Sequence, residues 1–344
     1  MTKGALNAEA RLAALPRLPL AQLPTPLTAV SALGAAIGLP DLWIKHDELI
    51  GFGFGGNKVR GLEFLVADAL KNGADVLVTG AGPQSNHVRA TAAAAAHASL
   101  GCVAVYWGDP PAEVQGNFAL TQMLGADCRF TGTLDRVSVD RTIQVVASEL
   151  RAEGRSPYPI PRGGACALGV LGHVLAVREF QLQYAALRLK PAVVMLAAGS
   201  GGTLAGWVLG KRLFGVDFRI EAVAVSRPAT ETRARVRALA EEAAVLLGGE
   251  AAAQLARAPI SDDEIIVHDG FIGDGYGLPT PEGISSIRTA ARVGGIFFDP
   301  TYTGKAFAGL TELAQGRHFQ NGGPVVFIHT GGEPALFAHA EAFE

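Results

Sequence analysis

The stretch Val193-Val194-Met195-Leu196-Ala197-Ala198-Gly199-Ser200-Gly201-Gly202-Thr203 joins a short apolar run directly to a glycine-rich loop. Its first six residues are apolar, as in strands that are buried on both faces, and a helical pattern follows from Leu204 to Phe214. A strand that runs through a glycine loop into a helix is the repeating unit of a parallel sheet covered by helices. The stretch therefore predicts an α/β fold.

Short apolar runs alternate with helical stretches along the rest of the chain as well. We expect further strands at Leu42–Lys45, Val76–Thr79, Cys102–Trp107, Asp127–Phe130, Ile220–Val225, Ile296–Phe298 and Val325–His329. We expect other helices at Val59–Asn72, Asn86–Ser99, Phe118–Leu124 and Val137–Glu153. This alternation predicts open, twisted, mostly parallel sheets with helices on both faces.

A proline- and glycine-rich passage, Ser156–Gly164, is the clearest interruption of this alternation. We place the end of a smaller inner α/β domain there and its start near Asn57. The chain is then divided into residues 57–163, the smaller domain, and residues 1–56 with 164–344, the larger one. A length of 344 residues is sufficient for two such domains.

The composition argues against several classes of protein. The net charge of −3 is spread along the chain, which gives no electrostatic reason to expect nucleic acid or a membrane surface as a partner. No apolar run reaches the length of a membrane span, and the first twenty residues contain no signal-peptide core. The three cysteines form no CxxC pair, which argues against a disulfide framework or a zinc site. We expect a cytoplasmic protein without a metal.

The loop Gly199-Ser200-Gly201-Gly202-Thr203 has the features of a phosphate site. At the start of a helix, backbone N–H groups lack partners and the helix dipole adds positive charge. Ser200 and Thr203 add hydroxyl donors, while Leu204 stands where a dinucleotide fingerprint needs glycine. The loop therefore favours a phosphate monoester, and the alternative is a plain strand–helix turn that uses small residues for close packing.

The stretch Gly51-Phe52-Gly53-Phe54-Gly55-Gly56-Asn57-Lys58 leads into another predicted helix. Glycines there let the backbone approach a ligand, and the helix start disfavours a charged ammonium on Lys58. A lysine whose pKa is lowered in this way suits Schiff-base chemistry. Taken alone, Lys58 is equally well explained as a surface lysine, and Lys45 and Lys305 are weaker candidates for the same role.

The loop Gly82-Pro83-Gln84-Ser85-Asn86-His87 also lies between a predicted strand and a predicted helix. Ser85 and Asn86 are natural helix N-caps, which is a sufficient structural explanation. The functional explanation is that the free N–H groups bind a carboxylate and that Asn86 binds a phenolic oxygen.

Five segments occur together in one order: Gly55–Arg60, Gln84–His87, Gly199–Thr203, Gly275–Gly277 and Tyr302–Lys305. In that order they resemble the fold-type II pyridoxal-phosphate (PLP) family related to the tryptophan synthase β-subunit. Within it they are most similar to the branch that holds D-cysteine desulfhydrase and 1-aminocyclopropane-1-carboxylate (ACC) deaminase. The resemblance implies two open α/β domains with PLP between them, and it runs from Leu23 to Gly332.

The resemblance also implies roles for individual residues. Lys58 would be the Schiff-base lysine, and Gly199, Ser200, Gly201, Gly202 and Thr203 would bind the phosphate. Ser85, Asn86 and His87 would bind the substrate, with Asn86 also on the PLP phenolate oxygen. Tyr302 would stack near the ring and Tyr276 would face the substrate side chain. Without the family, both tyrosines are better explained as half-buried packing.

Two threonines bear on the type of reaction that the resemblance implies. ACC deaminases have a glutamate after the second tyrosine that keeps the pyridine nitrogen protonated. Here that position is Thr303, and Thr330 is expected to face the same atom. A hydroxyl cannot hold a proton there as a carboxylate does, which favours β-elimination from D-cysteine over ring opening of ACC.

The expected function is thus a PLP-dependent lyase that converts a small amino acid, D-cysteine above all, to pyruvate, sulfide and ammonia. Arg162 departs from the branch and leaves L-cysteate open as a substrate, although it is equally well explained as pointing to solvent. ACC deaminase activity and a catalytically silent PLP-binding protein also stay open. The family resemblance implies a homodimer as well.

Overall fold

In the computed structural model, which describes residues 3–320 and 322–344, the chain forms two separate sheets. The larger sheet has the strand order β1-β2-β10-β7-β8-β9 and is parallel except for β1, which runs antiparallel to β2. Its strands are β1 (Leu27–Ala29), β2 (Leu42–His46), β7 (Val193–Ala198), β8 (Arg219–Ala224), β9 (Ile266–His268) and β10 (Val325–His329). The predicted mostly parallel α/β architecture is therefore confirmed.

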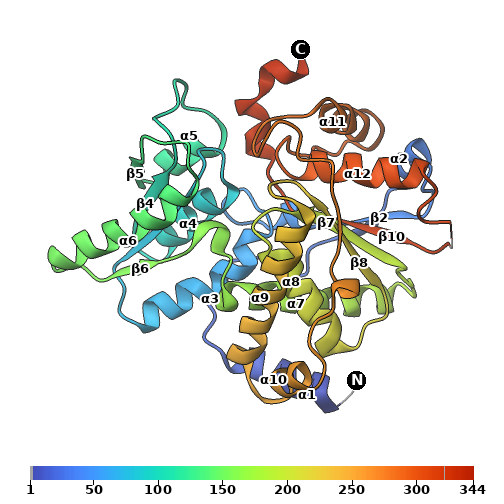
Figure 1. Cartoon of the computed structure of the whole chain (residues 1–344), viewed down its shortest axis with the longest axis horizontal. Helices are drawn as coiled ribbons and strands as arrows, with labels where there is room; N and C mark the ends of the chain where they lie inside the picture. Colours follow the sequence, from blue (N-terminus) through green and yellow to red (C-terminus); the bar gives the residue numbers. More distant parts are fainter. Residues whose placement is uncertain (1–2, 321) are drawn as a thin grey trace.

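The smaller sheet is parallel throughout and has the order β5-β4-β3-β6. Its strands are β3 (Val76–Ala81), β4 (Gly101–Tyr106), β5 (Asp127–Phe130) and β6 (Pro157–Pro159). All four lie inside residues 57–163, the range assigned to the smaller domain. Figure 1 shows this sheet and its helices on the left and the larger sheet on the right. The domain boundaries themselves remain a prediction.

Helices cover both sheets, as parallel strands that are buried on both faces require. The helices beside the smaller sheet are α3 (Lys58–Lys71), α4 (Asn86–His97), α5 (Gly116–Met123) and α6 (Val137–Ala152). Those around the larger sheet are α1 (Lys3–Ala14), α2 (Ser31–Ile37), α7 (Ala167–Ala186), α8 (Gly202–Phe214), α9 (Ala229–Leu247), α10 (Gly249–Arg257), α11 (Pro281–Gly294) and α12 (Thr303–Gln315).

One predicted strand is wrong. The run Ile296–Phe298 forms no strand, although Phe298 is fully buried. Its ring packs against the rings of Phe307 and Phe327, so the apolar side chains of this run fill the core from a loop. A short apolar run cannot be assigned to a strand from its hydrophobicity alone.

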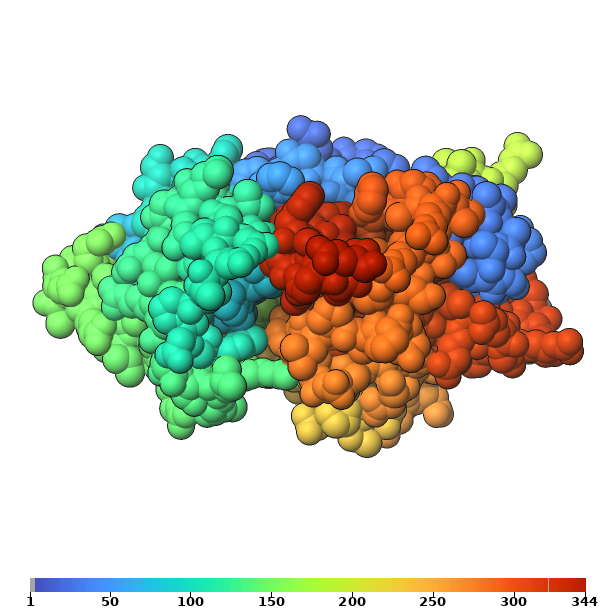
Figure 2. Space-filling model, turned by 90° about the horizontal axis from the view of Figure 1, so that it is seen from above, coloured from blue at the N-terminus to red at the C-terminus, as the bar shows by residue number. Residues whose placement is uncertain are grey.

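The C-terminal segment lies between the two halves of the molecule. The short 3-10 helix Glu333–Ala338 follows β10 and packs against α5, which belongs to the smaller sheet. Figure 2 shows these last residues in red between the green and orange parts of the surface. A chain that leaves the larger sheet thus closes over the junction with the smaller one.

A buried ionic network fixes α3 to the larger sheet. The Arg60 guanidinium donates to both carboxylate oxygens of Asp47 at 2.7 and 2.9 Å and to Glu179 of α7 at 3.0 Å. Lys45 of β2 also pairs with Glu179, and its Nζ donates to the Thr25 carbonyl at 2.6 Å. Arg60 is 2% exposed and is two residues from Lys58, so this network sets the position of the start of α3.

Among the residues that the structure describes, no helix combines the length and the apolar character that crossing a membrane requires.

Candidate active site

A cavity of about 540 Å³ lies where the two sheets meet, beyond the carboxyl ends of β3, β7, β8 and β10. Ligands of open parallel sheets bind at such strand ends. Most of the predicted site residues line it: Lys58, Ser85, Asn86, His87, Gly199, Ser200, Gly201, Thr203, Tyr276, Tyr302 and Thr330. The structure therefore brings together segments that are far apart in the sequence.

Lys58 is the first residue of α3, one position earlier than the helix start expected from the sequence. Burial lowers the pKa of its ammonium from the ordinary value to about 8. No salt bridge to Lys58 occurs within residues 3–320 and 322–344, so nothing offsets the cost of burying the charge. A half-buried lysine with a lowered pKa offers a free amine near neutral pH, which is what a nucleophile or a base needs.

The two other candidate lysines, Lys45 and Lys305, make polar contacts outside the cavity. Lys45 belongs to the buried network with Glu179, and the Lys305 Nζ donates to the carbonyls of Ile272 at 2.6 Å and Gly275 at 3.2 Å. Neither lines the cavity, and within the described parts of the chain Lys58 is the lysine that does.

The glycine loop turns into α8 as the sequence predicts. Gly201 is the N-cap of α8 with φ of 92°, a left-handed conformation in which a side chain is strained. Gly199 lies beside the ring of Tyr302, and a Cβ atom there would be 3.0 Å from Tyr302 Cε1. Asn57 Nδ2 donates to Thr203 Oγ1 at 2.7 Å and so couples the lysine segment to this loop.

Replacing Gly201 with alanine tests whether the loop binds phosphate. If it does, we expect the affinity for PLP to fall at least about tenfold, because a strained residue would displace the N–H groups that would meet the phosphate. Gly215→Ala is the matched control, since Gly215 caps the other end of α8 with φ of 63° and has open space around it.

As apoproteins both variants should lose thermal stability, roughly 1 kcal/mol for Gly215→Ala and somewhat more for Gly201→Ala. The reason is that Gly215 has regular left-handed angles (φ 63°, ψ 41°), whereas Gly201 does not (φ 92°, ψ −18°). Equal losses of PLP affinity in Gly201→Ala and Gly215→Ala, measured by fluorescence titration, would instead support a purely structural turn.

The Ser85 loop has the N-cap that the sequence predicts, and it also lines the cavity. Ser85 is the N-cap of α4, since its hydroxyl accepts from the backbone N–H of Val88 at 3.3 Å. Asn86 Oδ1 accepts from Asn117 Nδ2 at 2.8 Å, which leaves the Asn86 amide nitrogen as a donor. His87 Nε2 meets the Thr79 hydroxyl at 3.0 Å. Burial, with the nearby Lys58 charge, lowers the pKa of His87 to about 3, so this ring is neutral.

Two tyrosines form one wall of the cavity. The hydroxyls of Tyr276 and Tyr302 are hydrogen-bonded to each other, and the rings are 5.7 Å apart. Asp299 positions Tyr302 at the start of α12, because its Oδ2 accepts from the backbone N–H of Tyr302 at 2.9 Å. Burial raises the pKa of both phenols. Both tyrosines therefore keep their protons, and one hydroxyl donates to the other.

Two predicted site residues do not line the cavity. Gly202 begins α8 behind the loop, and Thr303 is fully buried with its hydroxyl donating to Asp299 Oδ1 at 2.7 Å. Thr330, which follows β10, does line the cavity and is 8% exposed. Its carbonyl accepts from the backbone N–H of Asn57 at 3.1 Å. Of the two threonines expected at the pyridine nitrogen, the structure thus brings only Thr330 to the cavity wall.

Sequence reasoning missed an arginine-rich part of the cavity. The additional lining residues include Trp107, Arg136, Arg227 and Arg235. The Arg136 guanidinium lies 4.8 Å from the centre of the Tyr276 ring and 5.9 Å from that of Trp107. Arg227 lies shortly after the end of β8, which is the one sequence signal that marks it as a candidate. Arg136 and Arg235 reach the cavity through tertiary packing alone.

The fold and site agree with the family to which the chain belongs, the pyridoxal-phosphate dependent enzymes, whose model matches residues 18–331. The chain is 39% identical over 339 residues to a D-cysteine desulfhydrase of Yersinia pestis (strain Pestoides F), covering 97% of this chain and 99% of that protein. A D-cysteine desulfhydrase of Salmonella choleraesuis (strain SC-B67) is 38% identical over 333 residues, 95% of this chain and 97% of its own. A crystal structure of an ACC deaminase homologue matches with a TM-score of 0.88 and 37% identity, over 100% of this chain and 99% of that one.

The lining of the cavity fits pyridoxal phosphate, the cofactor of this family. The cavity offers a lysine with a lowered pKa, a helix start with free N–H groups and an amide donor on Asn86. Lys58 would hold the cofactor covalently, the Gly199–Thr203 loop would bind its phosphate and Tyr302 would lie against its ring. These assignments of individual residues are proposals that the geometry supports.

Proposed function

We propose that this protein is a lyase that converts D-cysteine and water to pyruvate, hydrogen sulfide and ammonia. The observation that carries the proposal is Lys58, a lysine with a lowered pKa that faces the same cavity as the glycine loop and the two tyrosines. The substrate is taken from the D-cysteine desulfhydrases that resemble the chain over nearly its whole length.

When bound, the cofactor supplies an electron sink for the charge that develops at the substrate Cα. The residues of the chain do the rest. The neutral amine of Lys58 takes the proton from Cα, since it is the only base of suitable pKa that we find in the cavity wall as described. The C–S bond then breaks and sulfide leaves with the electron pair.

The Ser85 loop and the tyrosines orient the substrate. The substrate carboxylate would be bound at the start of α4 by the Ser85 hydroxyl and nearby N–H groups, beside the neutral ring of His87. Tyr276 would face the substrate side chain, where its protonated hydroxyl can donate to the departing sulfur. Tyr302 would hold the cofactor plane through its contact with Gly199.

The charges in the cavity support elimination rather than opening of a cyclopropane ring. Among the described lining residues the one carboxylate is Asp140, and it is paired with Arg162 at 2.7 Å. No unpaired carboxylate of this lining would then be available to keep the pyridine nitrogen of a bound cofactor protonated, so the electron sink would be weak. A thiolate tolerates a weak sink, because it removes the charge as the Cα proton is lost, whereas ring opening has no such leaving group.

Initial rates with D-cysteine, L-cysteine, D-serine, L-cysteate and ACC test this proposal. We expect D-cysteine to give pyruvate and sulfide with the highest kcat/KM, and ACC to be at least about a hundredfold poorer. Efficient turnover of ACC to 2-oxobutyrate, with no elimination from any cysteine-like substrate, would refute the assignment. A bound chromophore with no product from the whole panel would point to a catalytically silent PLP-binding protein.

A second candidate function is elimination from an amino acid with an anionic side chain, such as L-cysteate. Four arginines line the cavity: Arg136, Arg162, Arg227 and Arg235. Burial first, and then the positive charges of Arg235 and Arg162, lower the pKa of Arg227, so the local potential is positive. A bound cofactor phosphate would neutralise part of this positive charge, and a substrate sulfonate would neutralise the rest. A higher kcat/KM for L-cysteate than for D-cysteine would favour this candidate.

The homodimer that the family resemblance implies remains a prediction. So do the cytoplasmic location and the absence of nucleic-acid and membrane partners, which the composition led us to expect.

A further inference from the structure

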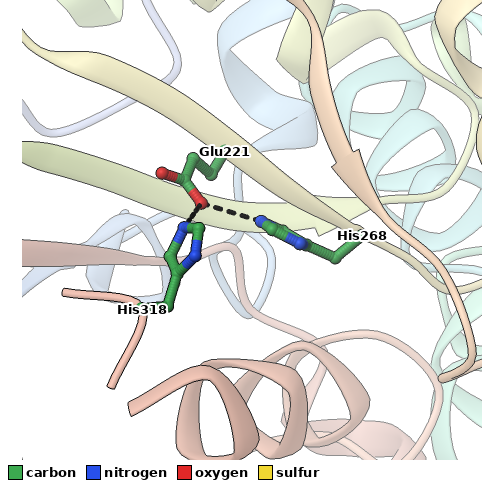
Figure 3. Close-up of side chains that lie close together, drawn as sticks. All are labelled: Glu221, His268 and His318. Carbon is green, nitrogen blue, oxygen red and sulfur yellow. Dashed lines mark hydrogen bonds and ion pairs between the residues drawn. The ribbon is translucent and has the colours of Figure 1, made fainter. Parts of the chain in front are cut away.

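Outside the cavity, two histidines and one glutamate meet at the edge of the larger sheet. Glu221 lies in β8, His268 is the last residue of β9, and His318 follows the end of α12 (Figure 3). The register pairs Val223 with His268, so their side chains share one face of the sheet, and Glu221, two residues from Val223, shares it too. That face is covered by α12, which brings His318 to the same place.

Both imidazoles point at the same oxygen. Glu221 Oε2 is 2.7 Å from His268 Nε2 and 2.9 Å from His318 Nε2, and the two rings are nearly perpendicular. The three ligand atoms all lie within 4.8 Å of one another. Because both rings use Nε2, each Nδ1 is left to carry the ring proton when Nε2 binds a metal.

The environment suits a cation that is open to solvent on one side. The Glu221 side chain is 1% exposed, that of His268 18% and that of His318 37%. Arg219 is the competing positive charge, but it meets the other oxygen, Oε1, at 3.2 Å and is half exposed, so it can turn away. A buried carboxylate with two imidazoles then remains as the ligand set.

We propose that Glu221, His268 and His318 bind one Zn²⁺ ion, with solvent as the fourth ligand. Imidazole nitrogen with carboxylate oxygen is a preferred set for this metal, and bonds of about 2.0–2.2 Å place neighbouring ligands roughly 3.3 Å apart. The two N–O contacts have only to lengthen by about half an ångström to admit the ion. No sequence motif points to a metal here, because the three ligands are far apart along the chain.

The ion would link three segments that are distant in sequence and would do so away from the cavity. α12 runs from Tyr302, its N-cap at the cavity wall, to Gln315, three residues before His318. A helix of this length spans about 20 Å. Zn²⁺ bound here therefore stabilises the sheet edge and α12 without contacting the cofactor.

The test is a calorimetric titration of the tag-free holoenzyme with ZnCl2, without substrate, because cysteine itself binds zinc. We expect one Zn²⁺ per chain, released by a chelator, and a rise of a few degrees in Tm when Zn²⁺ is in excess. Co²⁺ should give the visible absorption of a tetrahedral site. His268→Gln, His318→Gln and Glu221→Gln should each weaken binding at least about tenfold.

His97→Gln is the matched control, since His97 is an exposed histidine far from this cluster in sequence, and it should bind Zn²⁺ as the parent does. Glu221→Gln removes a buried charge and can destabilise the fold, so the decisive variant is His318→Gln at the exposed end. Full binding by both histidine variants, or less than one Zn²⁺ per parent chain at saturation, would overturn the proposal.

Discussion

Lys58→Ala protein should lose at least about a thousandfold in kcat/KM while remaining folded, because the residue that would hold the cofactor and move the Cα proton is gone. The absorption band of the lysine–cofactor linkage should vanish with it. Lys58 has no salt bridge in the described chain, so its removal takes away a buried amine with little structural function. Absorbance spectroscopy and a pyruvate assay measure both effects.

The low pKa of Lys58 gives this prediction a pH dependence. Burial lowers the pKa to about 8, so the free amine of the apoprotein forms as the pH rises through 8. The rate at which the apoprotein captures PLP should therefore rise up to about pH 8 and then level off. An unperturbed lysine would continue to gain free amine up to about pH 10.4.

Lys71→Ala is the control, because Lys71 is the exposed last residue of the same helix. It should keep the band and the activity. A borohydride-reducible adduct that persists in Lys58→Ala would move the assignment to Lys45 or Lys305.

Arg60→Met should lower the free energy of unfolding by about 3–5 kcal/mol, the usual result of leaving buried partners of an ion pair uncompensated. Burial opposes the charge on Arg60, but Asp47 and Glu179 outweigh it and raise its pKa. Burial likewise raises the pKa of Asp47, and Arg60 more than reverses this shift. Without Arg60, two buried carboxylates keep only Lys45 and Thr25 as polar partners from this network.

The sign of the pH effect follows from these shifts. The pKa values of Asp47 and Glu179 are lowered in the fold, so the stability they contribute is present above about pH 4 and is lost as the pH falls further. In Arg60→Met the same carboxylates can protonate at low pH. The difference in free energy of unfolding between the parent protein and the variant should therefore become smaller in acid. Urea unfolding at several pH values measures it.

Arg129→Met is the matched control for the ionic network. Arg129 also pairs with two carboxylates, Asp127 and Glu149, but its side chain is 37% exposed. Arg129→Met should lower the free energy of unfolding by less than about 1 kcal/mol. Equal losses in free energy of unfolding for Arg129→Met and Arg60→Met would mean that burial does not make the Arg60 ion pairs more important for stability.

The strands and glycine loops that carry the fold can be predicted because their signals are local. The apolar runs Val193–Ala198 and Val325–His329 predict strands with the bounds that the structure has, and the glycines before Lys58 predict a helix start beside it. Sequence reasoning misses β1, β6 and β9, because each has three residues and β6 begins and ends with proline. So short a run carries too little periodicity to be recognised.

The arginines of the cavity cannot be predicted, because tertiary packing alone brings most of them there. Arg136 reaches the tyrosine wall from a loop before α6, on the side of the smaller sheet. Thr303 is the opposite case, a predicted site residue that packing keeps away from the cavity wall. The family resemblance suggests a place for Thr303 at the pyridine nitrogen, but the hydrogen bonds with Asp299 hold its hydroxyl in the interior.

The pairing of β2 with β10 has a consequence for the order in which the chain can fold during synthesis. The strand that joins β2 to β7 is β10, Val325–His329, which follows every other described strand along the chain. All strands of the smaller sheet emerge long before, and they can pair at once. The nascent chain therefore carries β2 without its parallel partner until β10 has been made. We expect chaperones that shield such apolar segments to matter more for the yield of folded protein than for its final stability.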